Sequence, residues 1–139
     1  MNQEGILAYI PQRPPFVMVD EVIKADDKVS LSRFTIRNDN IFIENGVFIE
    51  PGLVENMAQT AAAGTGYKLR ALGKPVPVGY IAGIRSLVIK KLPAVNKTII
   101  TEMFFQQQIM NAHIVYGKIM ADNEEIASCE LRIFVKQED

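Results

Sequence analysis

Stretches in which apolar and polar residues alternate, or in which β-branched and aromatic residues dominate, occur on both sides of the middle of the chain and predict β-strands. The first two cover residues 16–25 and 28–37, and the Asp26-Asp27 pair between them predicts a hairpin. Four further stretches with this pattern cover residues 78–92, 98–110, 112–121 and 126–136. The pattern therefore predicts about six strands.

Apolar residues recur every three or four positions over residues 53–72, which predicts one long helix between the two groups of strands. Pro51-Gly52 precedes this helix, and Gly73 with two nearby prolines ends it. Its middle, residues 60–66, contains only small side chains, and each glycine there lowers helix stability by about 1 kcal/mol relative to alanine. We therefore expect a sheet wrapped around the helix to approach it closely at this point.

The order of the elements is two strands, one helix and four strands, which predicts an α+β domain with a long helix on an antiparallel sheet. The length of 139 residues fits a single domain spanning residues 1–139. Apolar residues make up 48% of the chain and charged residues 22%, which is the balance of an ordinary soluble globular protein.

The net charge of −1 gives no bulk electrostatic reason to expect nucleic acid or an anionic membrane as a partner. Charged residues, proline or glycine interrupt every apolar stretch before it reaches the length of a membrane span. The first residues lack the basic segment of a signal peptide, and one cysteine suits a reducing compartment, so we expect a cytoplasmic protein. The sequence contains neither a cluster of metal-ligating residues nor a glycine-rich phosphate loop, so we expect no metal and no cofactor.

Three segments carry a resemblance to a known family. Residues 10–20 read IPQRPPFVMVD, residues 51–59 read PGLVENMAQ, and residues 80–85 read YIAGIR. In this order they resemble the opening motif, the start of the central helix and the following strand of the 3-hydroxyacyl-[acyl-carrier-protein] dehydratases, the FabZ-like proteins of fatty acid synthesis. The nearest subgroup is that of the dehydratase-like proteins of aryl-polyene and pigment pathways.

The resemblance implies a hotdog fold, in which a curled antiparallel sheet of about six strands wraps one long central helix. It also implies that two protomers pair edge to edge and that an acyl chain enters a tunnel at their interface. The implied partners are an acyl carrier protein or a coenzyme A thioester, and a second copy of the chain in a homodimer or a higher multiple. A heterodimer with an active dehydratase paralogue is the alternative assembly.

The resemblance further implies a site at the start of the helix. Glu55 matches the family's catalytic carboxylate, although a glutamate in the first turn of a helix also complements the helix dipole. Gln59 is expected to orient Glu55 or the thioester, with an ordinary polar helix position as the alternative. The backbone amides of Gly52 and Leu53 lie where donors to the thioester oxygen are needed, and ordinary helix initiation would also place them there.

The family's catalytic histidine has no counterpart in this chain. An alignment anchored on Glu55 places Ile41 at that position, and an alignment anchored on the proline-glycine pair before the helix places Ile43 there. The family's second histidine corresponds to Gln12. Glutamine forms hydrogen bonds but does not transfer protons at neutral pH, so the expected acid–base pair is incomplete.

Two other reactive side chains are interpreted as structural. His113 is the only histidine of the sequence, and it lies in a late strand on the same face as Val115 and Ile119. A single histidine at such a position is more typical of a structural than of a catalytic role. Cys129 has no second cysteine and no neighbouring histidine, which predicts a small buried apolar side chain rather than a nucleophile.

Three functions are consistent with these features. The first is an acyl-thioester-binding member of the dehydratase family in fatty-acid-like or polyene biosynthesis, which dehydrates its substrate slowly or not at all. The second is a non-catalytic partner subunit that pairs with an active dehydratase paralogue. The third is a hotdog thioesterase that uses Glu55 and a water molecule.

Overall fold

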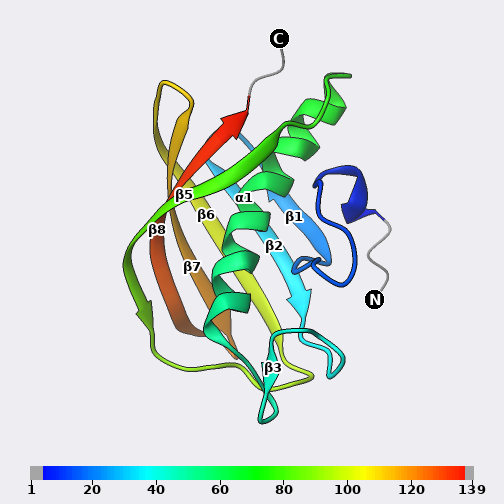
Figure 1. Ribbon diagram of the computed structural model, residues 1–139, viewed down its shortest axis with the longest axis vertical. Coiled ribbons are helices and arrows are strands. Elements are labelled where there is room, and N and C mark those ends of the chain that lie inside the picture. The colour runs from blue at the N-terminus through cyan, green and yellow to red at the C-terminus, as the bar shows by residue number, and fades with distance from the viewer. Residues whose placement is uncertain (1–4, 137–139) are drawn as a thin grey trace.

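Helix α1 lies in the concave face of a curled six-stranded antiparallel sheet in the computed structural model, which describes residues 5–136 (Figure 1). The strand order is β1-β2-β6-β7-β8-β5, and each neighbouring pair is antiparallel. The strands span Glu21–Ala25 (β1), Val29–Thr35 (β2), Val78–Ile89 (β5), Thr98–Ile109 (β6), Ala112–Ala121 (β7) and Glu124–Lys136 (β8), and α1 spans Glu50–Ala71. The α+β hotdog fold expected from the sequence is confirmed.

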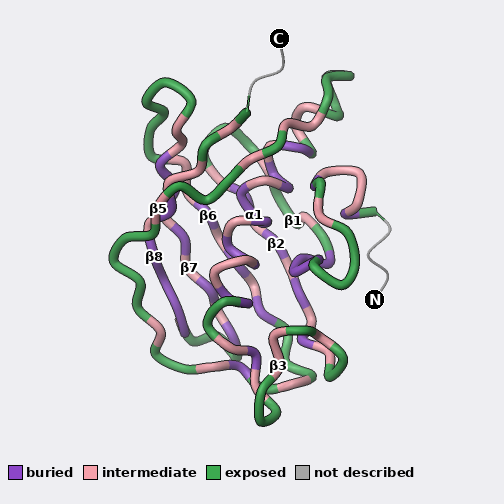
Figure 2. The backbone as a smooth tube through the Cα atoms, in the orientation of Figure 1, coloured by how far each residue is buried: buried purple, intermediate pink, exposed green. Residues whose placement is uncertain are grey.

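The core lies between α1 and the strands that face it, where Figure 2 shows the buried residues gathered. The helix supplies Leu53 and Met57 to this core, and three of its partners are Met103, Ile119 and Leu131 of the sheet. Burial of each such side chain stabilises the fold by about 1.5–3 kcal/mol. The first half of α1 is therefore held firmly on the sheet, together with the polar residues that it carries.

The small residues of α1 do permit close contacts, as expected. A Cβ atom on Gly64 would overlap the Oγ atom of Ser30 in β2. A Cβ atom on Gly66 would overlap the carbonyl oxygen of Tyr9, which follows the short helix η1 at Ile6–Ala8. The sheet therefore accounts for one of these two glycines, and the segment before β1 accounts for the other.

Helix α1 begins at Glu50, three residues before the predicted start at residue 53, and ends at Ala71, one residue before the predicted end. Pro51 lies in the first turn of the helix, where a missing N–H group leaves no hydrogen bond unmade. The proline-glycine pair therefore belongs to the helix instead of preceding it.

The strand predicted for residues 16–25 begins only at Glu21, so the first half of that prediction is wrong. Side chains of α1 bind the backbone of residues 16–18. The Oε1 atom of Gln59 accepts a hydrogen bond from the Met18 N–H (2.6 Å), and its Nε2 atom donates to the Phe16 carbonyl (2.7 Å). Asn56 donates to the Met18 carbonyl (2.7 Å). These backbone groups thus find their partners on the helix rather than on a neighbouring strand.

A small hairpin that the pattern analysis missed joins β2 to α1. It consists of β3, Ile43–Glu44, and β4, Val47–Phe48. Its two turn residues, Asn45 and Gly46, both have positive φ, at 51° and 79°. An Asn-Gly pair is the usual signal for such a turn, so this element was readable in the sequence.

Strand β5 forms one edge of the sheet. Six of its apolar side chains are between 38% and 57% exposed, and they are Val78, Tyr80, Ile81, Ile84, Leu87 and Val88. An edge strand with exposed apolar residues presents unpaired backbone N–H and C=O groups and a hydrophobic surface to other chains. This edge is therefore the surface through which we expect the protomer to assemble.

Candidate functional site

Glu55 and Gln59 lie one turn apart on α1 and are joined by a hydrogen bond of 3.0 Å from Gln59 Nε2 to Glu55 Oε1. Gln59 is fully buried. Its amide orientation is determined because Oε1 accepts the Met18 N–H, which leaves the two hydrogens of Nε2 for Glu55 and for the Phe16 carbonyl. Gln59 therefore holds one oxygen of Glu55 in a defined place.

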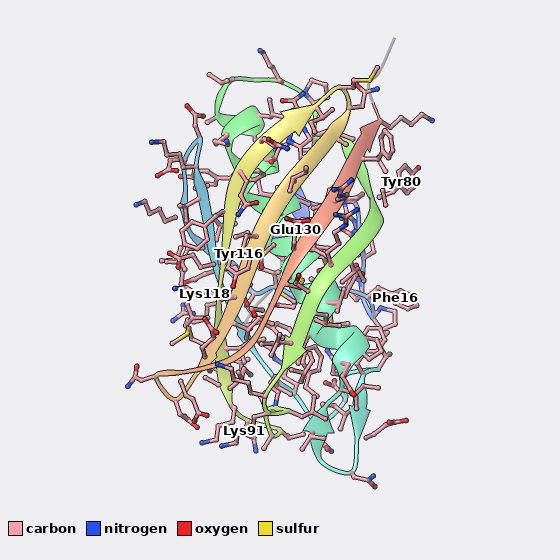
Figure 3. All side chains as sticks on the ribbon, turned by 90° about the vertical axis from the view of Figure 1, so that its left-hand side faces the viewer. Phe16, Tyr80, Lys91, Tyr116, Lys118 and Glu130 are labelled. Carbon is pink, nitrogen blue, oxygen red and sulfur yellow. The ribbon has the colours of Figure 1, made fainter. Side chains whose placement is uncertain are left out.

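Glu55 borders a cavity of about 230 Å³. The walls come from the segment before β1, from α1, and from strands β5 and β8, and they consist of Gln12, Ala58, Ala62, Gly79, Tyr80, Ile81 and Ile133 beside Glu55 itself. Figure 3 shows Phe16 and Tyr80 along the side of the molecule that β5 forms. The cavity thus combines one carboxylate with a largely apolar wall at the exposed edge of the sheet.

The structure brings Gln12 to the same cavity as Glu55, although the two residues lie far apart along the chain. The Oε1 atom of Gln12 is buried and has no hydrogen-bond partner among the described residues. A buried acceptor without a partner weakens the fold by about 1–3 kcal/mol. Gln12 therefore contributes to the cavity wall while its amide oxygen lies buried, without a partner among the described residues.

The amides of Gly52 and Leu53 occupy the first turn of α1, as the sequence suggested. Both N–H groups donate to the carbonyl of Ile49, at 2.9 Å and 3.3 Å. A Cβ atom on Gly52 would overlap the ring of Phe48, which covers this turn. Neither residue lines the cavity of Glu55. Their assignment to the thioester oxygen stays a prediction.

Ile41 and Ile43 are the two candidates for the position of the missing histidine. Ile41 lies just before the β3–β4 hairpin, and Ile43 is the first residue of β3. Neither lines the cavity of Glu55 within one protomer. Neither position therefore contributes to the wall of the carboxylate site within one protomer.

His113 lies in β7 and lines two other cavities, not that of Glu55. Its ring stands edge-on to Phe105, with 6.4 Å between the ring centres. Burial, together with the nearby Lys68, lowers the pKa of His113 below its ordinary value, so the imidazole is neutral at physiological pH. Because His113 lines other cavities, it does not belong to the carboxylate site.

Cys129 is fully buried, as predicted, with its sulfur 3.7 Å from that of Met57. Burial, with a smaller contribution from Glu130, raises the pKa of the thiol to about 11. The reactive thiolate is therefore scarce at neutral pH, which agrees with a packing role.

Dehydration or hydrolysis of a thioester requires groups that move protons. Glu55 is the only carboxylate that lines its cavity, and no histidine lines it within residues 5–136. The same residues contain no group of three or more side chains arranged to hold a metal ion. The site therefore offers one proton-transfer group of the expected kind, oriented by Gln59.

No helix within residues 5–136 is both long and apolar enough to cross a membrane.

The family model called ApeP-like, described as ApeP dehydratase, matches residues 5–139. A 3-hydroxyacyl-[acyl-carrier-protein] dehydratase FabZ of Shewanella baltica is 27% identical over 141 residues, which cover 94% of this chain and 90% of that protein. A FabZ of Xylella fastidiosa is 23% identical over 136 residues, with coverages of 91% and 83%.

Solved structures share the fold at lower sequence identity. A chain of the dehydratase heterocomplex ApeI:P from Xenorhabdus doucetiae has a TM-score of 0.88 and 17% identity, and the match covers 96% of this chain and 91% of that one. A hypothetical thioesterase protein from Streptococcus pneumoniae TIGR4, solved with coenzyme A, has a TM-score of 0.66 and 13% identity, with coverages of 85% and 86%.

Proposed function

This chain belongs to the ApeP-like dehydratase family, and on that premise we propose that it binds an acyl thioester at the Glu55 cavity as one subunit of a heteromeric dehydratase. One observation carries the proposal. Glu55 is oriented by Gln59 in a cavity with apolar walls, while no histidine lines that cavity among the described residues. The protomer thus holds half of the acid–base pair that dehydration needs.

The reaction makes the need for a second group explicit. Dehydration of a 3-hydroxyacyl thioester breaks the C–H bond beside the carbonyl and the C–O bond of the 3-hydroxyl, and it forms a carbon–carbon double bond and water. One group must take the proton from carbon, and another must give a proton to the departing hydroxyl. Glu55 performs one of these transfers, and a side chain of a paralogous subunit performs the other.

Two further features support a heteromer. A chain of similar fold comes from a dehydratase heterocomplex. The exposed apolar edge of β5 lies beside the cavity, because Tyr80 and Ile81 belong to both. A subunit that pairs along β5 would therefore bring its own side chains close to Glu55. The acyl group is carried by an acyl carrier protein or by coenzyme A.

The test compares the purified chain alone with the complex that it forms when co-expressed with a dehydratase paralogue from the same organism. We expect the complex, but not the chain alone, to convert a 3-hydroxyacyl thioester rapidly to the conjugated enoyl product, followed by ultraviolet absorbance. Glu55→Gln should lower the rate of the complex by about 10²–10⁴-fold. Glu50→Gln is the matched control, because Glu50 lies in the first turn of the same helix but is exposed and outside the cavity.

Two results would contradict the proposal. Fast dehydration by the chain alone would show that it needs no partner. Release of free thiol from an unsubstituted acyl thioester, dependent on Glu55, would instead support the thioesterase hypothesis.

A further inference from the structure

The Glu55 cavity is the first of three cavities that lie in series along α1. A narrow apolar cavity of about 40 Å³ shares Ala62, Gly79 and Ile133 with it. A third cavity of about 350 Å³ shares Thr65, Phe105 and His113 with the narrow one. The shared walls place the three cavities side by side between α1 and the sheet, in a row from Glu55 to His113, and we take this row as the path of a bound chain.

The side chains of α1 along this path are small. Ala58, Ala62 and Thr65 are spaced by one turn of helix and line the path in that order. Thr65 lies ten positions after Glu55, which corresponds to about 15 Å along the helix axis. The path therefore has the length and the apolar middle that suit an extended acyl chain.

The far end of the path is polar. Besides His113, the third cavity is lined by Lys68, Asp27 and the exposed glutamines at positions 106–108. Lys68 forms an ion pair of 3.6 Å with Asp27 and lies 5.5 Å from the centre of the Phe105 ring. A plain methyl end of an acyl chain would gain nothing from such surroundings, whereas a hydroxyl end would find partners.

His113 stands at the boundary between the apolar and the polar parts of the path. A neutral imidazole has one donor and one acceptor nitrogen, so it can both give a hydrogen bond to a hydroxyl oxygen and accept one from a hydroxyl hydrogen. The ring stands edge-on to Phe105, which lines the same two cavities.

We propose that His113 is a specificity-determining residue that binds the end of the acyl chain remote from the thioester, and that the preferred chains carry a hydroxyl group at this end. This inference rests on the proposed binding of an acyl thioester at Glu55. It assigns the solitary histidine to substrate selection rather than to proton transfer.

Calorimetric titration with N-acetylcysteamine thioesters of increasing chain length tests the proposal, with each chain made in a methyl-ended and a hydroxyl-ended form. We expect short chains to show no preference. Chains that reach His113 should bind about two- to tenfold more tightly with the hydroxyl end, which is the range of one neutral hydrogen bond. His113→Leu should remove this preference, and His113→Gln, which keeps hydrogen-bonding groups, should retain part of it.

Tyr116→Phe is the matched control, because Tyr116 belongs to the same strand but lies on the face of the sheet turned away from α1 (Figure 3). It should keep the full preference, and thermal unfolding of each variant should show an intact fold. A hydroxyl preference that is absent, or that survives His113→Leu, overturns this inference alone. If no thioester of any length binds, the proposed function fails as well, so the two failures are distinguishable.

Discussion

Gln59 donates a hydrogen bond to Glu55 and, with the same amide group, binds the backbone at Phe16 and Met18. The carboxylate of the site and the segment that leads into β1 are therefore held by one side chain. Any change at Gln59 should affect the stability of the fold and the geometry of Glu55 together.

Gln59→Ala should lower the free energy of unfolding by about 2 kcal/mol or more, because it leaves the Met18 N–H and the Phe16 carbonyl without partners. Glu55→Gln should change stability little, because its amide oxygen can still accept the hydrogen bond from Gln59. Urea unfolding measures both. Equal midpoints for Gln59→Ala and the unmodified protein would show that this network contributes nothing.

Gln12→His should give the homomeric chain measurable dehydration, with a gain of up to about 10²-fold over the unmodified homomer. Position 12 borders the Glu55 cavity, so a histidine there would meet the carboxylate within one protomer. Addition of Glu55→Gln should abolish the gain. Enoyl thioester formation is the readout.

Ile41→His and Ile43→His are the comparison variants, because neither position borders that cavity within one protomer. If one of these two variants dehydrates faster than the unmodified homomer in a Glu55-dependent way, and Gln12→His does not, the acid–base pair lies across a protomer interface. Such a result would also identify the correct alignment of the loop before α1.

Ile84→Lys should convert a dimer into monomers, because it puts a charge on the exposed apolar edge of β5. Ile23→Lys is the matched control on β1, at the opposite edge of the sheet, where the side chain is 47% exposed and that of Ile84 is 45% exposed. Light scattering at micromolar concentration gives the masses. A monomeric unmodified protein, or a loss of the dimer only with Ile23→Lys, would contradict pairing through β5.

Gly64→Ala should destabilise the protein by about 1–3 kcal/mol through overlap with Ser30, even though alanine is the better helix former. Ser30→Gly in the same chain should restore part of the loss, so the two changes should not add. Gly83→Ala is the control, because its new Cβ atom would meet only ordinary contacts, the nearest at 3.8 Å. Thermal or urea unfolding of the unmodified protein, Gly64→Ala, Ser30→Gly and the double variant completes the cycle, with Gly83→Ala measured beside it.

The sequence determined the elements whose signals are local. The helix and the six strands of the sheet follow from periodicity, since the side-chain repeat of a helix or a strand is visible within a short window. The small residues of α1 correctly indicated a close neighbour. The resemblance of residues 51–59 to the start of a dehydratase helix likewise singled out Glu55, and Gln59 with it. The β3–β4 hairpin also had a local signal, the Asn45-Gly46 pair, which the search for periodicity passed over.

Only the tertiary structure decided how distant segments meet. Residues 16–20 have the composition of a strand, but Gln59, 43 positions after Phe16, competes for their backbone hydrogen bonds. The shared cavity of Gln12 and Glu55, and the path from Glu55 to His113, likewise depend on contacts between segments far apart in the chain. Such contacts form because the curled sheet and the helix bury their apolar faces together, and no local pattern records which polar side chains that burial brings side by side.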